Sequence, residues 1–140
     1  MNQRLQLALN VPDLDAAVDY YQRLFGVDAA KRKPGYANFE VAEPPLKLVL
    51  FQNADRTDRL NHLGVEVMAP DQVATAADRQ TQAGLTVQHD SDQTCCFARQ
   101  AKAVSYAPDG TMWEWYYKHE DVDGFWGTPP TTQPDPGRCC

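Results

Sequence analysis

One order of strand, helix and glycine occurs twice in this sequence, and it limits the possible folds more than any other feature. In the first half, the apolar run Gln6–Val11 predicts a short strand, and Pro12-Asp13 directly after it predicts the start of a helix. Asp13 can cap this helix, and Gly26 can end it in a left-handed turn. The apolar positions between them fall on one helical face; they are Leu14, Ala17, Val18, Tyr21, Leu24 and Phe25.

The second half repeats this order. The run His62–Val67 predicts a strand, Pro70-Asp71 follows it, and a second helical stretch ends at Gly84. Two isolated coincidences would carry little weight. The same order of strand, Pro-Asp, helix and glycine in both halves instead indicates a duplicated unit of about 55 residues.

Further strands are predicted after each helix. They cover residues 29–32, 37–41 and 46–51 in the first half, and residues 86–89, 101–106 and 112–117 in the second. Each half is therefore a βαβββ module, and the fold class is α+β. We expect one domain over residues 1–123, with module one at about 3–56 and module two at about 58–120. The sequence from 124 to 140 is rich in Pro, Gly and Thr, which predicts a flexible tail.

Composition excludes several classes of partner. The chain of 140 residues is 43% hydrophobic, which suffices for the core of one domain, and its net charge is −6. Basic residues cluster only at Lys31-Arg32-Lys33, so neither nucleic acid nor an anionic membrane is an expected partner. The first residues do not resemble a signal peptide, and no apolar run approaches the ~20 residues of a membrane span. We expect a cytoplasmic protein with reduced thiols and a small-molecule substrate, either monomeric or homodimeric.

The four cysteines occur as two adjacent pairs, Cys95-Cys96 and Cys139-Cys140. Neighbouring Cα atoms lie ~3.8 Å apart, whereas unstrained disulfides need roughly 4.4–6.8 Å, so such a pair favours a two-thiolate clamp for one soft atom. The alternative is one buried and one exposed cysteine on a strand. Because Cys95-Cys96 follows the polar stretch 89–94, we expect an exposed capture loop, although a solvated connection would have the same sequence pattern.

Three polar residues occupy informative positions on the predicted strands. Glu114 shares one strand face with Met112 and Tyr116, and a carboxylate there is costly to bury unless a cation or a donor meets it. Gln6 and His62 open the repeated strands. Taken singly, His62 could be a structural histidine and Gln6 a strand-edge amide. His89 and His119 lie in polar surroundings and are expected at the surface.

Two stretches carry a resemblance to a known superfamily: NHLGVEV, residues 61–67, and YAPDGTMWEWY, residues 106–116. Together with the paired modules, they resemble the vicinal oxygen chelate superfamily of glyoxalase I, fosfomycin-resistance proteins and extradiol dioxygenases, over roughly residues 3–118. The resemblance implies a cupped mixed sheet with metal ligands at Gln6, His62 and Glu114. Two neutral ligands and one carboxylate leave coordination positions open. Such sites usually carry two histidines; with Gln6 as the first ligand, Fe(II), Mn(II) and Ni(II) all stay possible.

A finer resemblance lies in QLALNV, KRKPGYANFEVAEPPLKLVL, LNHLGVEV and TCCFA. These segments are similar to the organoarsenical carbon–arsenic lyases and the cadmium-induced glyoxalase-like proteins. The resemblance implies an Fe(II)-dependent dioxygenase that cleaves the carbon–arsenic bond of trivalent organoarsenicals and releases arsenite. In that family a cysteine pair binds the arsenic, and here it corresponds to Cys95 and Cys96. Cys139 and Cys140 would be an accessory site for arsenic or another soft metal.

Two other functions remain open from the sequence. One is a non-catalytic protein that sequesters cadmium or arsenite through its cysteine pairs, which oxygen consumption would distinguish from an enzyme. The other is a drug-binding or thiol-transfer resistance protein of the fosfomycin type. That type needs a cationic phosphonate pocket, and the only basic cluster in this sequence is residues 31–33.

Overall fold

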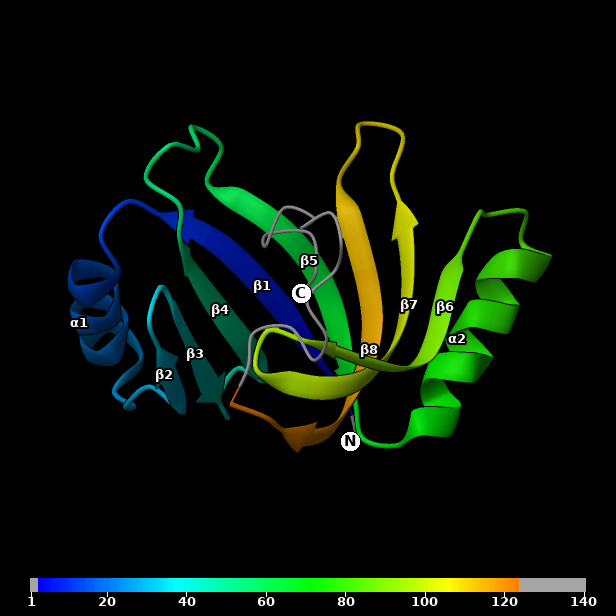
Figure 1. Cartoon of the computed structure of the whole chain (residues 1–140), viewed down its shortest axis with the longest axis horizontal. Coiled ribbons are helices and arrows are strands. Elements are labelled where there is room, and N and C mark those ends of the chain that lie inside the picture. Colours follow the sequence, from blue (N-terminus) through cyan, green and yellow to red (C-terminus); the bar gives the residue numbers. More distant parts are fainter. Residues whose placement is uncertain (1–2, 124–140) are drawn as a thin grey trace.

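Eight strands form one curved mixed sheet, and a helix packs against its outer face in each half of the chain (Figure 1). The computed structural model describes residues 3–123, so the predicted tail, including Cys139 and Cys140, lies outside the described residues. In chain order the elements are β1 (Gln3–Val11), α1 (Leu14–Phe25), β2 (Lys31–Lys33), β3 (Tyr36–Val41), β4 (Leu46–Gln52), β5 (Leu60–Val67), α2 (Pro70–Gln82), β6 (Gln88–Cys95), β7 (Ala98–Tyr106) and β8 (Met112–Asp121).

The order of the strands confirms the α+β fold of two joined modules. It runs β2-β3-β4-β1-β5-β8-β7-β6, so the first strand of each module lies at the centre. There β1 and β5 pair antiparallel, and each pairs on its other side, in parallel, with the last strand of its own module. The predicted metal ligands Gln6, His62 and Glu114 therefore come from three adjacent strands, β1, β5 and β8.

Local sequence explains both helices. Asp13 accepts a hydrogen bond from the Ala16 backbone N–H, and Gly26 ends α1 with a φ of 69°, as predicted. Ala69 precedes α2 and has no side-chain acceptor, so Gln72 accepts the backbone N–H of Met68 and Ala69 instead. Among the described residues, no helix has the length and apolar character needed to cross a bilayer.

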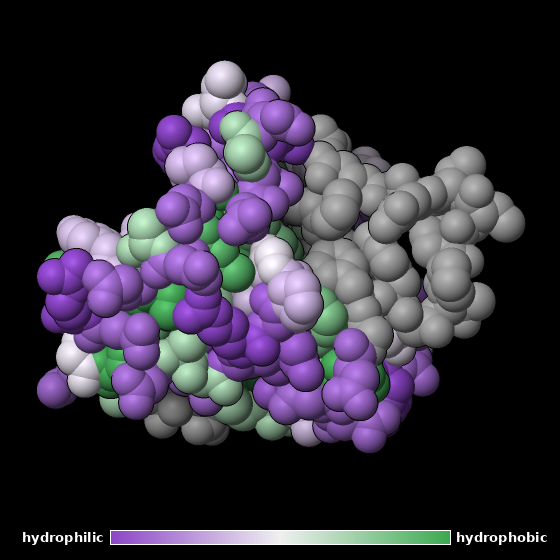
Figure 2. Space-filling model, turned by 60° about the vertical axis from the view of Figure 1, so that its left-hand side comes forward, coloured by the Kyte–Doolittle hydropathy of each residue, from purple (hydrophilic) through white to green (hydrophobic). Residues whose placement is uncertain are grey.

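Alternation along the strands divides the apolar residues between the two sheet faces. On the outer face, α1 covers a cluster that includes Phe39 and Leu50, and α2 covers a second around Val67. A third cluster lies on the inner face, and it contains both Cys95 and Cys96. Seen with the α1 side turned forward, the surface is mostly hydrophilic, and hydrophobic residues show as separate areas between polar side chains (Figure 2). Because α1 and α2 cover the outer face of the sheet, the inner face is available for a functional site.

One sequence prediction about the second module is wrong. We expected a short strand at 86–89 followed by an exposed loop, but residues 88–95 form a single strand, β6, paired with β7. β6 is an edge strand whose first five side chains are exposed. Because backbone hydrogen bonds to β7 hold it, its side chains need not be apolar, and hydrophobic alternation does not reveal it.

Candidate functional site

Strand register brings the predicted metal ligands together. Gln6 on β1 lies opposite Gly64 on β5, and Gly64 lies opposite Glu114 on β8, so the three residues form one row across the sheet. His62 is two residues before Gly64 and projects from the same face of β5. Gly64 separates two long side chains, and its missing side chain leaves the space in which they meet. A Cβ at this position would lie 2.9 Å from Cγ of Glu114 and 3.3 Å from Nε2 of Gln6.

The three side chains are in direct contact and almost inaccessible to solvent, with exposures of 3% for Gln6, 0% for His62 and 1% for Glu114. Gln6 Nε2 donates to Glu114 Oε1 at 2.7 Å and lies 2.9 Å from His62 Nε2. His62 Nε2 is also 3.3 Å from Glu114 Oε1. The structure thus groups the three residues as the sequence predicts, while their role as metal ligands stays a prediction.

Asn61 sets the orientation of His62. His62 Nδ1 lies 2.7 Å from Asn61 Oδ1, which can only accept, so Nδ1 carries the proton and donates it. Nε2 then carries the lone pair, which points toward Gln6 and Glu114 and accepts from Gln6 Nε2 in this structure. This is the tautomer that a histidine needs to bind a metal through Nε2.

The donor set fits a divalent cation. Oε2 of Glu114 is buried without a hydrogen-bond partner among the described residues, although the Lys102 ammonium lies 2.9 Å away. A buried carboxylate beside an imidazole lone pair is a strong cation ligand. Gln6 would bind through its amide oxygen, so its amide would have to turn over relative to this structure. In the described part of the chain, no three His, Cys, Asp or Glu residues are grouped to hold a metal, so a site here depends on Gln6.

The sequence led us to expect the cysteine pair in an exposed loop, but the structure places it in a buried turn. Cys95 ends β6, and Cys96 and Phe97 form the two-residue turn that leads into β7. Both turn residues have positive φ, 53° and 63°, which is unusual for residues other than glycine and costs of order 1–3 kcal/mol each. Cys95 is 0% and Cys96 3% exposed, because the turn packs on Ala8, Val49 and Phe51 of module one. The module-two turn therefore reaches across the inner face to module one.

Both cysteines are disulfide-bonded in the structure, and the described part of the chain contains no free cysteine. The sequence instead predicts reduced thiols. Only thiolates bind a soft atom, so capture by this pair requires that both sulfurs be reduced first.

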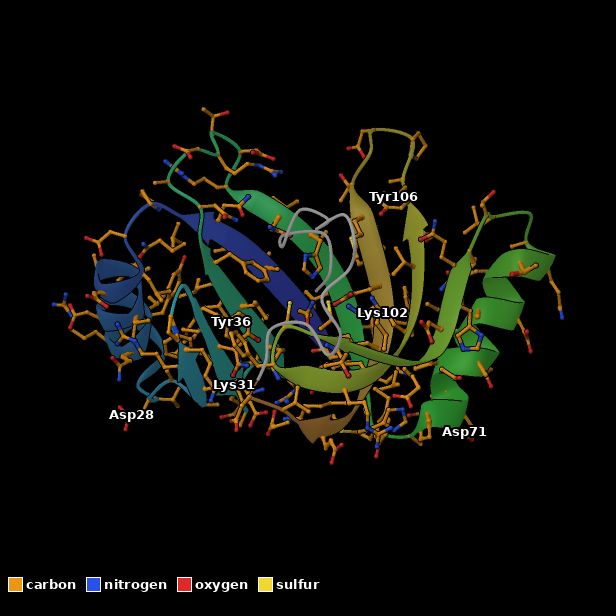
Figure 3. All side chains as sticks on the ribbon, in the orientation of Figure 1. Asp28, Lys31, Tyr36, Asp71, Lys102 and Tyr106 are labelled. Carbon is orange, nitrogen blue, oxygen red and sulfur yellow. The ribbon has the colours of Figure 1, made fainter. Side chains whose placement is uncertain are left out.

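A cavity connects the turn with the predicted metal ligands. Its lining includes Gln6 and Glu114 on one side and Cys96 on the other, and its volume is ≈ 30 Å³, which is room for about one water molecule. In Figure 3, Tyr36 and Lys31 lie on the module-one side of the cup and Lys102 on the module-two side. An aromatic chain runs along the inner face from Phe97 through Tyr36 and Phe51 to His62, with ring centroids 5.4 to 6.4 Å apart.

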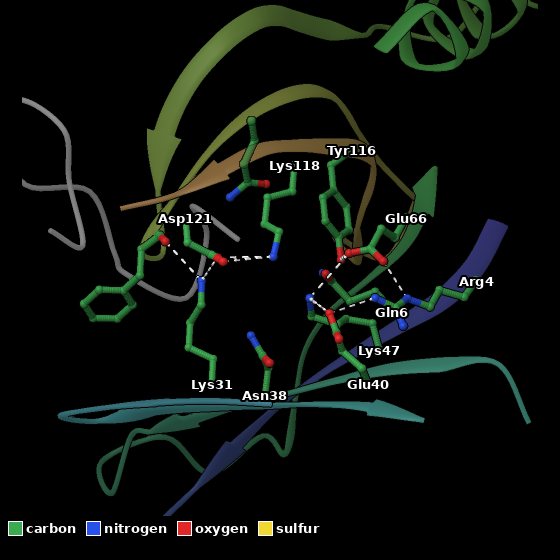
Figure 4. A network of polar contacts seen from close by, with 12 residues as sticks. Arg4, Gln6, Lys31, Asn38, Glu40, Lys47, Glu66, Tyr116, Lys118 and Asp121 are labelled. Carbon is green, nitrogen blue, oxygen red and sulfur yellow. Dashed lines mark hydrogen bonds and ion pairs between the residues drawn. The ribbon is translucent and has the colours of Figure 1, made fainter. Parts of the chain in front are cut away.

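A network of charged groups lies beside the cavity and shares Lys47 and Tyr116 with its lining (Figure 4). Glu66 accepts from Arg4 Nε at 2.5 Å and from the Tyr116 hydroxyl at 3.0 Å, and it lies 3.4 Å from Lys47 Nζ. Burial opposes ionisation of Glu66, but Lys47 and Arg4 outweigh it and lower its pKa. Burial lowers the pKa of Lys47.

Two tyrosines of the cavity lining stay protonated. Burial raises the pKa of Tyr36, and burial together with the Glu66 charge raises that of Tyr116. At neutral pH both hydroxyls are therefore hydrogen-bond donors.

Sequence reasoning missed Gly64, Asn61 and Lys102. An isolated glycine inside a strand signals a close approach, which was the available clue for Gly64. Lys102 stands between Ala101 and Ala103 on β7 and is 3% exposed; a lysine in a run of small residues is a weaker clue. His89 is exposed and His119 partly exposed, as expected, and His119 Nε2 lies 3.1 Å from the Ser91 carbonyl oxygen.

The sequence matches the profile of the glyoxalase/bleomycin resistance protein/dioxygenase superfamily over residues 3–115. The cadmium-induced protein CadI of Mycobacterium bovis is 47% identical over 140 residues, covering 98% of this chain and 92% of its own length. The trivalent organoarsenical cleaving enzyme of Thermomonospora curvata is 46% identical over 138 residues, covering 98% of this chain and 87% of its own.

Solved structures with low sequence identity share the fold. The Mn(II)-bound glyoxalase of Novosphingobium aromaticivorans superposes with a TM-score of 0.62 at 19% identity, covering 88% of this chain and 42% of its own. A mutant of homoprotocatechuate 2,3-dioxygenase from Brevibacterium fuscum gives 0.61 at 16% identity, covering 89% and 34%. Three findings agree on the family: the fold, the match to the superfamily profile, and relatives that are almost half identical over nearly the whole chain. This chain belongs to the glyoxalase/bleomycin resistance protein/dioxygenase superfamily.

Proposed function

We propose that this protein is an enzyme that cleaves the carbon–arsenic bond of trivalent organoarsenicals such as methylarsonous acid, with Fe(II) as cofactor and O₂ as co-substrate. The observation that carries the proposal is the single cavity lined by Gln6, Glu114 and Cys96. A glyoxalase needs only the metal ligands, and a sequestering protein needs only the thiols. An enzyme that oxidises a thiol-bound arsenical needs both beside one cavity. The protein of Thermomonospora curvata that is named a trivalent organoarsenical cleaving enzyme is 46% identical.

The cysteine pair would capture the substrate. An organoarsenical RAs(OH)₂ exchanges both hydroxyls for the sulfurs of reduced Cys95 and Cys96, and each hydroxyl leaves as water with one thiol proton. Arsenic is then held by two As–S bonds, while its bond to carbon stays intact. Because the pair lies in a packed turn, the bound arsenic would have little freedom, which favours reaction at one orientation.

Gln6, His62 and Glu114 would hold the metal, with Asn61 fixing the His62 tautomer and Lys102 balancing the Glu114 charge. Iron(II) bound there would supply the activation of O₂, which three protein ligands in a facial set leave room to bind. The Tyr36 and Phe97 rings pack together beside the cavity, and Tyr116, which also lines it, donates its hydroxyl hydrogen to Glu66.

The atoms balance without any further reactant. Methylarsonous acid, CH₃As(OH)₂, and one O₂ contain the atoms of arsenite, As(OH)₃, and formaldehyde, CH₂O. The carbon is oxidised, O₂ is reduced, and arsenic stays trivalent. The reaction would detoxify the arsenical, and reduced thiols would suit the cytoplasm.

Iron loading under anaerobic conditions provides the test. The protein is reduced with a phosphine rather than a dithiol, because dithiols bind trivalent arsenic themselves. It then receives Fe(II), methylarsonous acid and air, while arsenite is measured. We expect arsenite release that requires Fe(II) and O₂ and disappears in the double variant Cys95→Ser/Cys96→Ser. Arsenical binding without arsenite release by iron-loaded protein would exclude the enzyme.

A second candidate is a non-catalytic protein that binds cadmium or arsenite. It is favoured by the 47% identity to proteins named as cadmium-induced. Such a protein would bind the soft metal with Cys95 and Cys96 and consume no O₂. Oxygen uptake in the presence of substrate distinguishes the two candidates.

A further inference from the structure

The cysteine turn is held from both sides by hydrogen-bond donors that the proposed chemistry does not use. Gln100 Nε2 donates to the Cys95 carbonyl oxygen at 2.9 Å. The Phe97 carbonyl oxygen accepts two hydrogen bonds, at 3.1 Å from Lys31 Nζ and at 2.9 Å from the Val122 backbone N–H. The carbonyl groups before and after Cys96 are thus both fixed.

Lys31 differs from the other two donors because it belongs to the opposite module. It lies on β2, at the far edge of the sheet from β6, and the curl of the sheet brings it to the turn. Its ammonium also pairs with Asp121 at the end of β8 (Figure 4). Lys33 Nζ lies 3.7 Å from Asp123 Oδ1. Lys31 therefore links β2 of module one with both the cysteine turn and the end of β8.

This link acts on a strained segment. Two residues other than glycine with positive φ persist only where the surroundings hold them. The Phe97 ring packs against the Tyr36 ring at an interplanar angle of 56°, with centroids 5.4 Å apart, and this contact holds the side chain of the turn. Lys31 fixes the carbonyl side, and its own side chain is only 13% exposed, so water competes poorly for this hydrogen bond.

We propose that Lys31 is a positioning residue, which holds the Cys96-Phe97 turn at the distance from Gln6, His62 and Glu114 that carbon–arsenic cleavage requires. This inference rests on the proposed function. Lys31 touches neither arsenic nor metal in this scheme. Its loss leaves both thiols able to bind arsenic but lets the captured atom move relative to the metal ligands. A misplacement of about 1 Å can slow an enzyme by about a hundredfold.

The chain offers a matched control for the test. Lys31→Met removes the ammonium and keeps the length of the side chain, and Lys31→Arg keeps a cation that can donate to Phe97 and pair with Asp121. Arg32→Met removes the same charge from the next residue of β2. Arg32 pairs with Asp15 and is 46% exposed, away from the turn.

Three quantities are measured on phosphine-reduced protein: amide hydrogen exchange of residues 95–98, arsenical binding to the metal-free protein, and kcat of the iron-loaded protein. Lys31→Met should exchange faster in 95–98, keep its arsenical affinity within about threefold, and lose at least about tenfold in kcat, or about 1.4 kcal/mol. Lys31→Arg should recover most of the loss, and Arg32→Met should match the wild type.

Unchanged exchange in Lys31→Met, unchanged kcat, or an equal loss of kcat in Arg32→Met would overturn the proposal. If Lys31→Met does not fold, Asp121→Asn, which removes the ion pair that orients Lys31, gives the same comparison. If the wild type releases no arsenite, the proposed function fails. The exchange of residues 95–98 then still decides whether Lys31 holds the turn.

Discussion

Replacing Gly64 by alanine probes the packing that lets Gln6 and Glu114 meet. A Cβ on Gly64 would lie 2.9 Å from both Cγ and the backbone oxygen of Glu114, and 3.3 Å from Nε2 of Gln6. The Glu114 side chain could turn away, but its backbone oxygen belongs to the parallel ladder between β5 and β8 and cannot. The substitution therefore has two effects: it pushes β8 away from β5, and it displaces the Glu114 carboxylate.

The size of the effect follows from two opposing terms. Overpacking of this kind costs about 1–3 kcal/mol. Replacing glycine by alanine in an unstrained backbone raises the free energy of unfolding by about 0.4–1 kcal/mol, because it restricts the unfolded chain. We therefore expect a net loss of about 1–2 kcal/mol in the free energy of unfolding, or a fall in Tm of about 4–8 °C. Displaced ligands should also weaken Fe(II) binding by about 10- to 100-fold.

Anaerobic Fe(II) titration and thermal melts of Gly64→Ala measure both effects. Leu63→Ala is the control, because Leu63 neighbours Gly64 but projects from the other face of β5. It should lose comparable stability and keep its Fe(II) affinity. Gly64→Ala with wild-type Fe(II) affinity would refute the reasoning that this glycine makes room for a metal site.

The other predictions concern the ligands, the thiols and the buried charges. Glu114→Ala should weaken Fe(II) binding by more than about a hundredfold while circular dichroism still shows a folded protein; full metal retention would remove Glu114 from the site. Oxidised protein should bind no arsenical until a phosphine reduces Cys95 and Cys96, which arsenic-to-protein ratios after gel filtration will measure, and binding by the oxidised form would contradict thiolate capture. Deleting residues 128–140 should leave most of the activity, whereas a truncated protein as inactive as Cys95→Ser/Cys96→Ser would mean that both cysteine pairs form one site. The folded protein holds the pKa of Glu66 below its ordinary value of 4.5, so Glu66 stabilises the fold above that value, and this contribution is lost as the pH falls through the lowered pKa. Urea unfolding between about pH 7 and pH 3 should therefore show a shallower acid dependence for Glu66→Gln than for the wild type, and equal dependence would contradict the assignment.

Most of the fold could be predicted from the sequence, because helix ends and strand faces are determined by residues close together in the chain. Asp13 and Gly26 mark the ends of α1, and alternation on β8 separates Met112, Glu114 and Tyr116 from the opposite face. The full length of β6 was not predicted, because an edge strand with exposed polar side chains has no hydrophobic alternation to detect. The duplication then determined the topology, since each module repeats the same order of elements.

The candidate site was predictable only in part. Gln6, His62 and Glu114 occupy equivalent positions that repeat and resemblance indicate, and the structure brings them into contact. Lys31 and Lys102 could not be predicted, because their roles depend on the curl of the sheet and on cross-strand register rather than on neighbours in sequence. The burial of Cys95 and Cys96 was missed for the same reason, since module one covers them.

Simultaneous measurement of O₂ uptake and arsenite release tests the central proposal most directly. Reduced, iron-loaded protein is given methylarsonous acid in an oxygen-electrode cell, and arsenite is quantified at intervals. The proposal predicts one O₂ consumed for each arsenite released over many turnovers, and neither event in Cys95→Ser/Cys96→Ser. Tight arsenical binding with no O₂ uptake and no arsenite would contradict the proposal and favour a sequestering protein.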